Sequence, residues 1–140
     1  MRLHYAAFKA RLLEDAALAT AGVNDTALVD STTGLPIRGT YTILFGGAPD
    51  VLDDGRLSAL QFADSDAEYV YTVRSVSTTA DGVRSTQTKV GAQMIGHRLI
   101  VAGRSCRIEQ THATDVDWDK SVKPPLLFAD QEYTVYSSRV

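Results

Sequence analysis

The stretch from residue 68 to residue 96 constrains the fold most tightly, because a strand pattern is followed within a few residues by a helix pattern. The segment "EYVYTVRSVS" (68–77) is rich in β-branched and aromatic residues, which is typical of a strand. After the turn "TTADG", side chains at helical spacing indicate a helix that Thr78, Thr79 or Asp81 can cap and that Gly96 ends. The predicted apolar stripe of this helix comprises Val83, Gln87, Val90, Met94 and Ile95.

Four other segments have secondary-structure patterns of their own. "MRLHYAAFKARLLEDAALATAG" has apolar side chains three and four residues apart in an alanine- and leucine-rich sequence, which predicts one helix that stops at Gly22. "TYTILFGG" (40–47) predicts a short strand. "HRLIVAGRSCRIEQ" predicts two strands around a turn at residues 102–104, and "FADQEYTVYSSRV" predicts a terminal strand.

This order of elements predicts an α+β fold in a single domain of residues 1–140. We expect a mainly antiparallel sheet of four or five strands with two helices packed on it. Long loops are expected at residues 23–38 and 48–68, and the second of these is strongly acidic. The step from strand to helix after Ser77 leaves room for one parallel strand pair.

Composition excludes several classes of protein. A chain of 140 residues with 44% hydrophobic residues can bury a core without metal or disulfide support. The net charge of −3 gives no electrostatic case for nucleic-acid binding. The single cysteine, Cys106, rules out an internal disulfide and suits a reducing compartment. No apolar run approaches the roughly 20 residues needed to span a bilayer, and no signal sequence is visible, so we expect a soluble protein without a membrane partner.

The alternating carboxylates Asp115, Asp117 and Asp119 in "TDVDWDK" match the first ligand positions of a calcium loop. That loop requires glycine at its sixth position and glutamate at its twelfth, where this chain has Lys120 and Leu126. The match therefore fails where the chemistry is strict. We expect either a solvated connection or the rim of an interface.

The sequence contains no convincing catalytic set. The three histidines, His4, His97 and His112, show no metal-ligand spacing. Ser105 and Cys106 could be brought together with His97 or His112, but they lack the glycine-flanked context of a nucleophile. No glycine run suits a phosphate group. We predict no catalytic, cofactor-binding or metal-binding residue.

Aromatic residues offer candidate contacts with other proteins. Trp118 lies between two aspartates, and we weigh packing over the following prolines against anchoring in a partner. Tyr133 and Tyr136 lie in the terminal strand, where they are either buried in the sheet or part of an interface. We expect this strand to pair with the edge of a neighbouring molecule.

Three segments resemble the tail terminator proteins of long-tailed bacteriophages. "AEYVYTVRSVSTTADGVRSTQTKVGAQMIG" is similar to the strand–turn–helix unit of that family. "LIVAGRSC" looks like the hairpin that follows it. "DVDWDKSVKPPLLFADQEYTVYSSRV" resembles the family's C-terminal run of acidic loop, Pro-Pro-apolar-aromatic segment and final strand. The acidic stretch at residues 50–66 has no counterpart in the resemblance.

The resemblance implies a structural virion protein, assembled in the host cytoplasm, with no cofactor and no covalent chemistry. Family members form a ring, usually six-fold, which caps the head-proximal end of the tail tube, stops tube polymerisation and docks to the neck. The implied partners are further copies of the chain, the tube protein and a head-completion or neck protein, with DNA passing through the lumen without sequence-specific binding. Our interface candidates are Trp118, Tyr133, Tyr136, Asp53, Asp54, Asp64 and Asp66.

Two alternative functions stay open. One is a head-completion or tail-adaptor ring protein, which is also small and ring-forming. The other, less favoured, is a small metal-dependent enzyme that uses Asp115, Asp117 and Asp119.

Overall fold

The computed structural model describes residues 2–25, 39–51, 67–120 and 125–139. The helices and strands follow one another in the order α1 (Arg2–Leu13), α2 (Ala16–Ala21), β1 (Val23–Asn24), β2 (Tyr41–Val51), β3 (Ala67–Ser77), α4 (Ala80–Met94), β4 (Arg98–Val101), β5 (Arg104–Ala113), β6 (Asp117–Asp119) and β7 (Leu126–Arg139).

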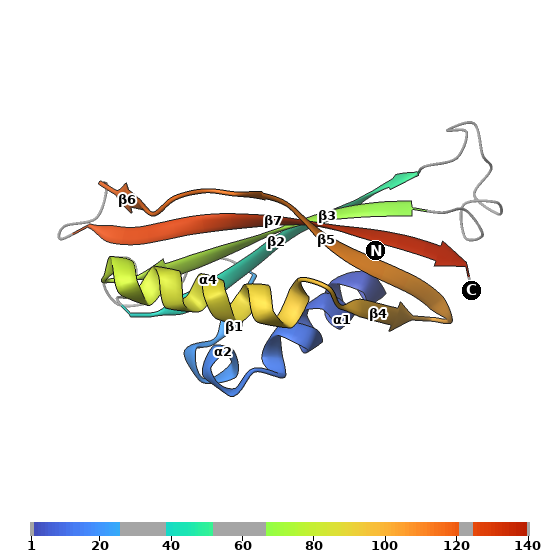
Figure 1. Ribbon diagram of the computed structural model, residues 1–140, viewed down its shortest axis with the longest axis horizontal. Helices are drawn as coiled ribbons and strands as arrows, with labels where there is room; N and C mark the ends of the chain where they lie inside the picture. The colour runs from blue at the N-terminus through green and yellow to red at the C-terminus, as the bar shows by residue number, and fades with distance from the viewer. Residues whose placement is uncertain (1, 26–38, 52–66, 121–124, 140) are drawn as a thin grey trace.

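The strands form one mixed sheet with the order β1-β2-β3-β7-β5-β4, and β6 pairs with β7 beyond the end of β5. All the helices in the described ranges lie on one face of this sheet (Figure 1). The α+β class is confirmed, but the expected four or five strands and two helices were too few. The one parallel pair among the described strands joins β1 to β2, and the other pairs are antiparallel.

The C-terminal strand β7 lies at the centre of the sheet. It pairs with β3 along one side and with β5 and β6 along the other. The sequence correctly predicted a terminal strand, but we also expected this strand to pair with the edge of a neighbouring molecule. That expectation was wrong, because both edges of β7 are occupied by strands of its own chain.

The main core lies between the sheet and the helices. Phe8 of α1 stacks on Tyr71 of β3, with ring centroids 4.7 Å apart, and also contacts Tyr133 of β7. Packing of such large rings contributes both buried area and favourable ring contacts. From α4, the buried side chains are Val83, Thr86, Val90 and Met94.

Two positions of the predicted helix stripe were wrong. Thr86 takes the buried position that was expected for Gln87, which is half-buried. Ile95 is 53% exposed because α4 ends at Met94 and the chain turns toward β4. Thr79 caps the helix as predicted, and its hydroxyl accepts a hydrogen bond from the Gly82 amide at 3.1 Å.

The predicted N-terminal helix is divided in two. Asp15 has an extended backbone, and its carboxylate accepts hydrogen bonds from the amides of Ala17 and Leu18. An aspartate in this position caps a new helix, so α1 ends before it and α2 begins after it. The predicted stop at Gly22 is confirmed: it adopts φ +98°, and its amide donates to the Leu18 carbonyl.

The strand β2 runs further than the predicted segment 40–47 and continues to Val51 across an irregularity between Gly46 and Pro49. Such a bulge lets a strand continue through residues that a simple alternation pattern would exclude. The two shortest strands, β1 and β6, lie in segments that we expected to be loops. Each is too short to show the apolar–polar alternation by which a strand is recognised in a sequence.

The turn between β4 and β5, predicted at residues 102–104, offers a test of local backbone strain. Ala102 and Gly103 both have positive φ, +50° and +76°. Two-residue hairpin turns require this backbone when their twist matches the right-handed twist of the two strands that they join. Alanine is unfavourable there, whereas asparagine is tolerated. We expect Ala102→Asn to stabilise the fold by roughly 0.5–1 kcal/mol. Thermal denaturation should show a higher midpoint, and a lower midpoint would contradict this account of the turn.

Candidate interaction surfaces

The face of the sheet opposite the helices carries its own ordered side chains. On β3, Tyr69 and Tyr71 point into the main core, while the intervening Val70 is 37% exposed on the other side. The same alternation places Phe45 of β2, 39% exposed, on the outer side. Successive side chains of a strand point to opposite faces of the sheet, so each strand contributes residues to both the core and the outer face.

Arg74 is the centre of a cluster on this outer face. Its Nε and Nη2 atoms donate to the two carboxylate oxygens of Asp130 at 2.8 and 3.0 Å. The guanidinium also lies over the ring of Phe128, 4.5 Å from the centroid, and 5.7 Å from that of Phe45. The hydrogen bonds with Asp130 raise the pKa of Arg74, so the group stays charged. This arrangement holds a flat cationic and aromatic surface in a fixed orientation.

A small hollow of about 100 Å³ adjoins the Arg74 cluster. It lies over a second apolar cluster that is separated from the main core by the sheet itself. Its size suits a single small side chain better than a cofactor, since ligand pockets are usually several times larger. The hollow is lined by Tyr41, Ile43, Arg74, Val76, Asp119, Leu126 and Phe128.

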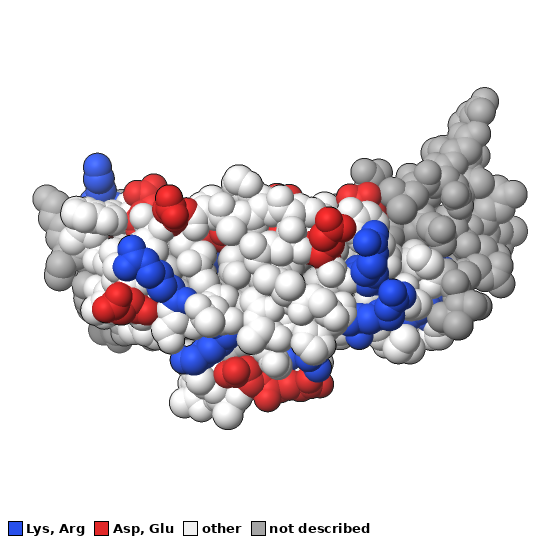
Figure 2. All heavy atoms as spheres, viewed as in Figure 1, with Lys and Arg blue, Asp and Glu red and all other residues white. Residues whose placement is uncertain are grey.

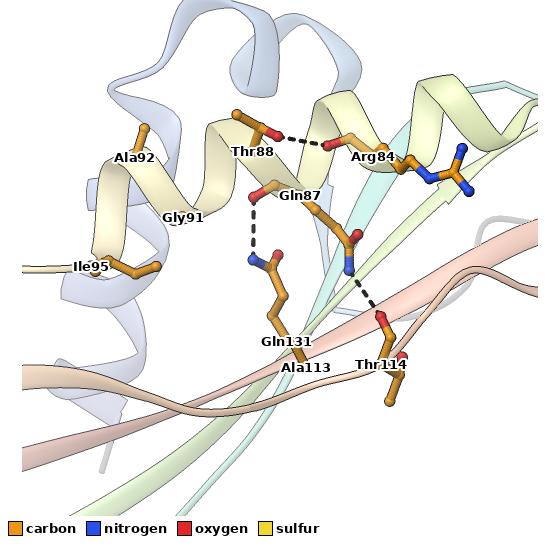
Figure 3. Close-up of a pocket in the computed structure, with 9 residues that line it drawn as sticks. All are labelled: Arg84, Gln87, Thr88, Gly91, Ala92, Ile95, Ala113, Thr114 and Gln131. Atoms are coloured by element: carbon orange, nitrogen blue, oxygen red, sulfur yellow. Dashed lines mark hydrogen bonds between the residues drawn. The ribbon is translucent and has the colours of Figure 1, made fainter.

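A wider and shallower groove of about 510 Å³ lies on the other face, between α4 and the strands β5 and β7, next to the C-terminal end of β5 (Figure 3). At its floor, Gln131 Nε2 donates to the Gln87 carbonyl at 3.2 Å, and Gln87 Nε2 donates to the Thr114 carbonyl at 3.5 Å. Arg84 and Ile95 lie toward the two ends of the helical side (Figure 3). The lining therefore offers amide groups and small side chains rather than a catalytic set.

The predicted contact residues lie in different surroundings. Trp118 is 58% exposed on β6, and Tyr136 is half-buried on the outer face with the Arg107 guanidinium 4.6 Å from its ring centroid. Tyr133 has no exposed surface, so its ring belongs to the core of this chain and is not available to a partner. The predicted residues Asp53, Asp54, Asp64 and Asp66 lie outside the described residues.

The aspartates of the 115–119 segment do not form a shared site. Asp117 and Asp119 lie on the strand β6, and Asp117 accepts a hydrogen bond from the Trp118 amide at 2.7 Å. Across the ranges that the structure covers, no group of three or more His, Cys, Asp or Glu side chains could hold a metal ion. The prediction of a simple solvated connection was therefore incomplete, because part of the segment is a strand.

The serine, cysteine and histidine residues weighed together from the sequence are not brought together. The Ser105 hydroxyl accepts from Arg98 at 2.6 Å, and His97 Nδ1 lies 2.9 Å from Arg11 Nη2. A different pair is formed instead, with His4 Nε2 2.9 Å from Ser137 Oγ. This buried contact joins residues 133 positions apart, and no local sequence signal could have found it.

Positive and negative side chains are interspersed on the face that Figure 2 shows, and neither sign dominates it. This mixture agrees with the small net charge of the chain. None of the helices in the described part of the chain has the length and apolar character that crossing a membrane requires.

Comparison with known proteins identifies the fold. No family model matches the chain, and no curated protein sequence does. A solved structure does match: a chain in the virion of a native gene transfer agent particle, with a TM-score of 0.60 and 18% sequence identity. The match covers 95% of this chain and 92% of the other, so the two share a fold over nearly their whole lengths.

Proposed function

We propose that this chain is a structural virion protein that forms a ring at the head-proximal end of a phage tail tube. The observation that carries the proposal is the shared fold with a chain of a gene transfer agent virion over 95% of this sequence. The resemblance of three sequence segments to tail terminators supports the same class by a separate route. The role is non-enzymatic, with no cofactor.

The two faces of the molecule suit a subunit with several neighbours. One face presents the Arg74 cluster on a side of the sheet that none of the described helices covers, and the other presents the groove beside α4. Two different surfaces on one chain allow head-to-tail contacts, which close into a ring when the rotation between subunits permits. The proposed partners are five further copies, as in the usual six-fold ring of the family, the tube protein and a head-completion protein.

The exposed Trp118 and the half-buried Tyr136 remain our candidates for contacts, because aromatic residues contribute strongly to interface energy. For the acidic residues of the segment 50–68, we propose a position at the lumen or against a neighbouring subunit. Carboxylates at the lumen would repel phosphates within about 8 Å at physiological salt and leave DNA free to slide.

The main alternative is a head-completion or tail-adaptor ring, which would share the virion location and differ in its position along the neck. The shared fold supports both roles equally. A metal-dependent enzyme has less support, because the described aspartates do not converge on a common point.

Electron microscopy of the purified chain, combined with mass measurement, tests the ring. We expect closed rings with one dominant copy number. Trp118→Ser should weaken ring formation, whereas Ile100→Ser, at another exposed apolar position, should leave it intact. Monomers alone at every protein concentration would contradict a self-assembling ring.

A further inference from the structure

A buried polar cluster joins the start of α1 to the sheet, and the proposed ring function makes no use of it. His4 is 7% exposed and stacks on Tyr69 of β3, with ring centroids 4.2 Å apart. Its Nε2 lies 2.9 Å from the hydroxyl of Ser137 on β7. The same hydroxyl accepts a hydrogen bond from Arg104 Nε of β5 at 2.8 Å. Three elements, α1, β5 and β7, therefore meet at one serine oxygen, and β3 packs against the His4 ring.

The hydrogen bonds determine which form of His4 fits. A guanidinium can only donate, so Ser137 Oγ accepts from Arg104, and the same hydroxyl pairs with His4 Nε2 either through its proton or through its second lone pair. In either tautomer the Nδ1 atom of His4 is buried and has no hydrogen-bond partner among the described residues. An imidazolium needs an acceptor for each of its two ring N–H groups, and the site provides none at Nδ1. The site therefore accommodates a neutral imidazole.

The charged and titratable groups that face this cluster come from each element packed against it. They are Tyr69 on β3 and Arg104 and Cys106 on β5. Burial, followed by the positive charges of the α-amino group and Arg104, lowers the pKa of His4 from 6.5 to about 4. A proton on His4 would place a second cation beside Arg104.

We infer that His4, Ser137 and Arg104 form an acid-sensitive latch, and that protonation of His4 releases the first half of α1 from the sheet. On α1, His4, Phe8 and Leu12 share one buried face at helical spacing. Release of the first turns removes His4 and Phe8 from the sheet together. It also uncovers Cys106, which is fully buried in the docked state. The Cys106 sulfur lies 3.6 Å from Ser137 Oγ.

The direction of the pH dependence follows from the two pKa values. The released state has an ordinary histidine, with a pKa near 6.5, and the docked state has a pKa of about 4. The released state therefore binds more protons between these values. The docked state has its full stability above pH 6.5 and loses stability as the pH falls toward 4. Between about pH 7.5 and about pH 5 the released fraction should rise about 30-fold.

Cys106 provides a specific readout, because it is the one cysteine in the sequence. The intact chain is labelled with a pyridyl disulfide reagent, which reacts at acid pH, and the rate is measured by mass spectrometry and normalised to the rate in denaturant. We expect the normalised rate to rise about 30-fold from about pH 7.5 to about pH 5. The emission of Trp118, on β6, should stay constant over the same range and show that the sheet remains folded.

Two variants make the test specific. His4→Gln can still bond to Ser137 but does not titrate, so its rates at the two pH values should be equal, whatever their absolute size. His112→Gln removes an exposed histidine and should retain the full 30-fold rise, approximately as in the unmodified chain. A rise that persists in His4→Gln, an unmodified chain with equal rates at both pH values, or labelling that coincides with a change in Trp118 emission would each overturn the inference.

Discussion

Replacing Val90 with aspartate is expected to unfold the chain or make it aggregate. Val90 lies on the buried face of α4, has no exposed surface and packs in the main core. An unpaired carboxylate in such a site costs several kcal/mol, about the whole stability margin of a small domain. Urea denaturation and size-exclusion chromatography of the variant measure the effect.

The matched control is Thr88→Asp, which adds the same charge to an exposed position two residues earlier on the same helix. It should change the free energy of unfolding by less than about 0.5 kcal/mol. If the Val90 variant were soluble and melted cooperatively near the unmodified midpoint, this face of α4 could not be core.

Replacing Gly46 with alanine should destabilise the fold by roughly 2–4 kcal/mol. Gly46 adopts φ +100° in β2, which is unfavourable for a residue with a side chain. A Cβ atom there would lie 2.6 Å from the carbonyl oxygen of Val70. That oxygen belongs to the backbone of the neighbouring strand, so relief requires the two strands to separate locally. The shift in the midpoint of urea unfolding measures the cost.

Gly96→Ala separates the two contributions at Gly46. Gly96 also has positive φ, +76°, but a Cβ atom there would meet nothing within 4 Å. Its cost should be about 1 kcal/mol, from backbone conformation alone. Equal effects of the two substitutions would show that the strands adjust freely around Gly46, and the close contact between β2 and β3 would carry no energetic weight.

Patterns that depend on neighbouring residues were predicted well. The strand β3, the cap at Thr79, the helix α4 and the hairpin from β4 to β5 follow from side-chain period and turn chemistry over a few residues each. The division between α1 and α2 was missed, because the alanine-rich composition favours one helix and Asp15 was not treated as a cap. Local competition between a cap and helix propensity decides that point.

Features that depend on distant residues could not be predicted from the sequence. The period of two places Tyr133 and Tyr136 on opposite faces of the sheet, but it does not show which face the helices cover. Because α1 packs on the face that carries Tyr133, that ring is the buried one. The Arg74 cluster and the contact between His4 and Ser137 each join residues that are far apart in the chain. They arise from strand order, which no local pattern specifies.

The most direct test of the proposed function is electron microscopy of particles assembled without this protein, from a phage that carries an amber mutation in its gene. A terminator must match the growing end of the tube on one side and present a different surface on the other, which prevents further growth. We therefore expect unjoined heads and tails, with tubes that grow past their normal length. Capped tails of normal length beside leaking heads would favour the head-completion alternative, and joined virions with normal tails would contradict the account.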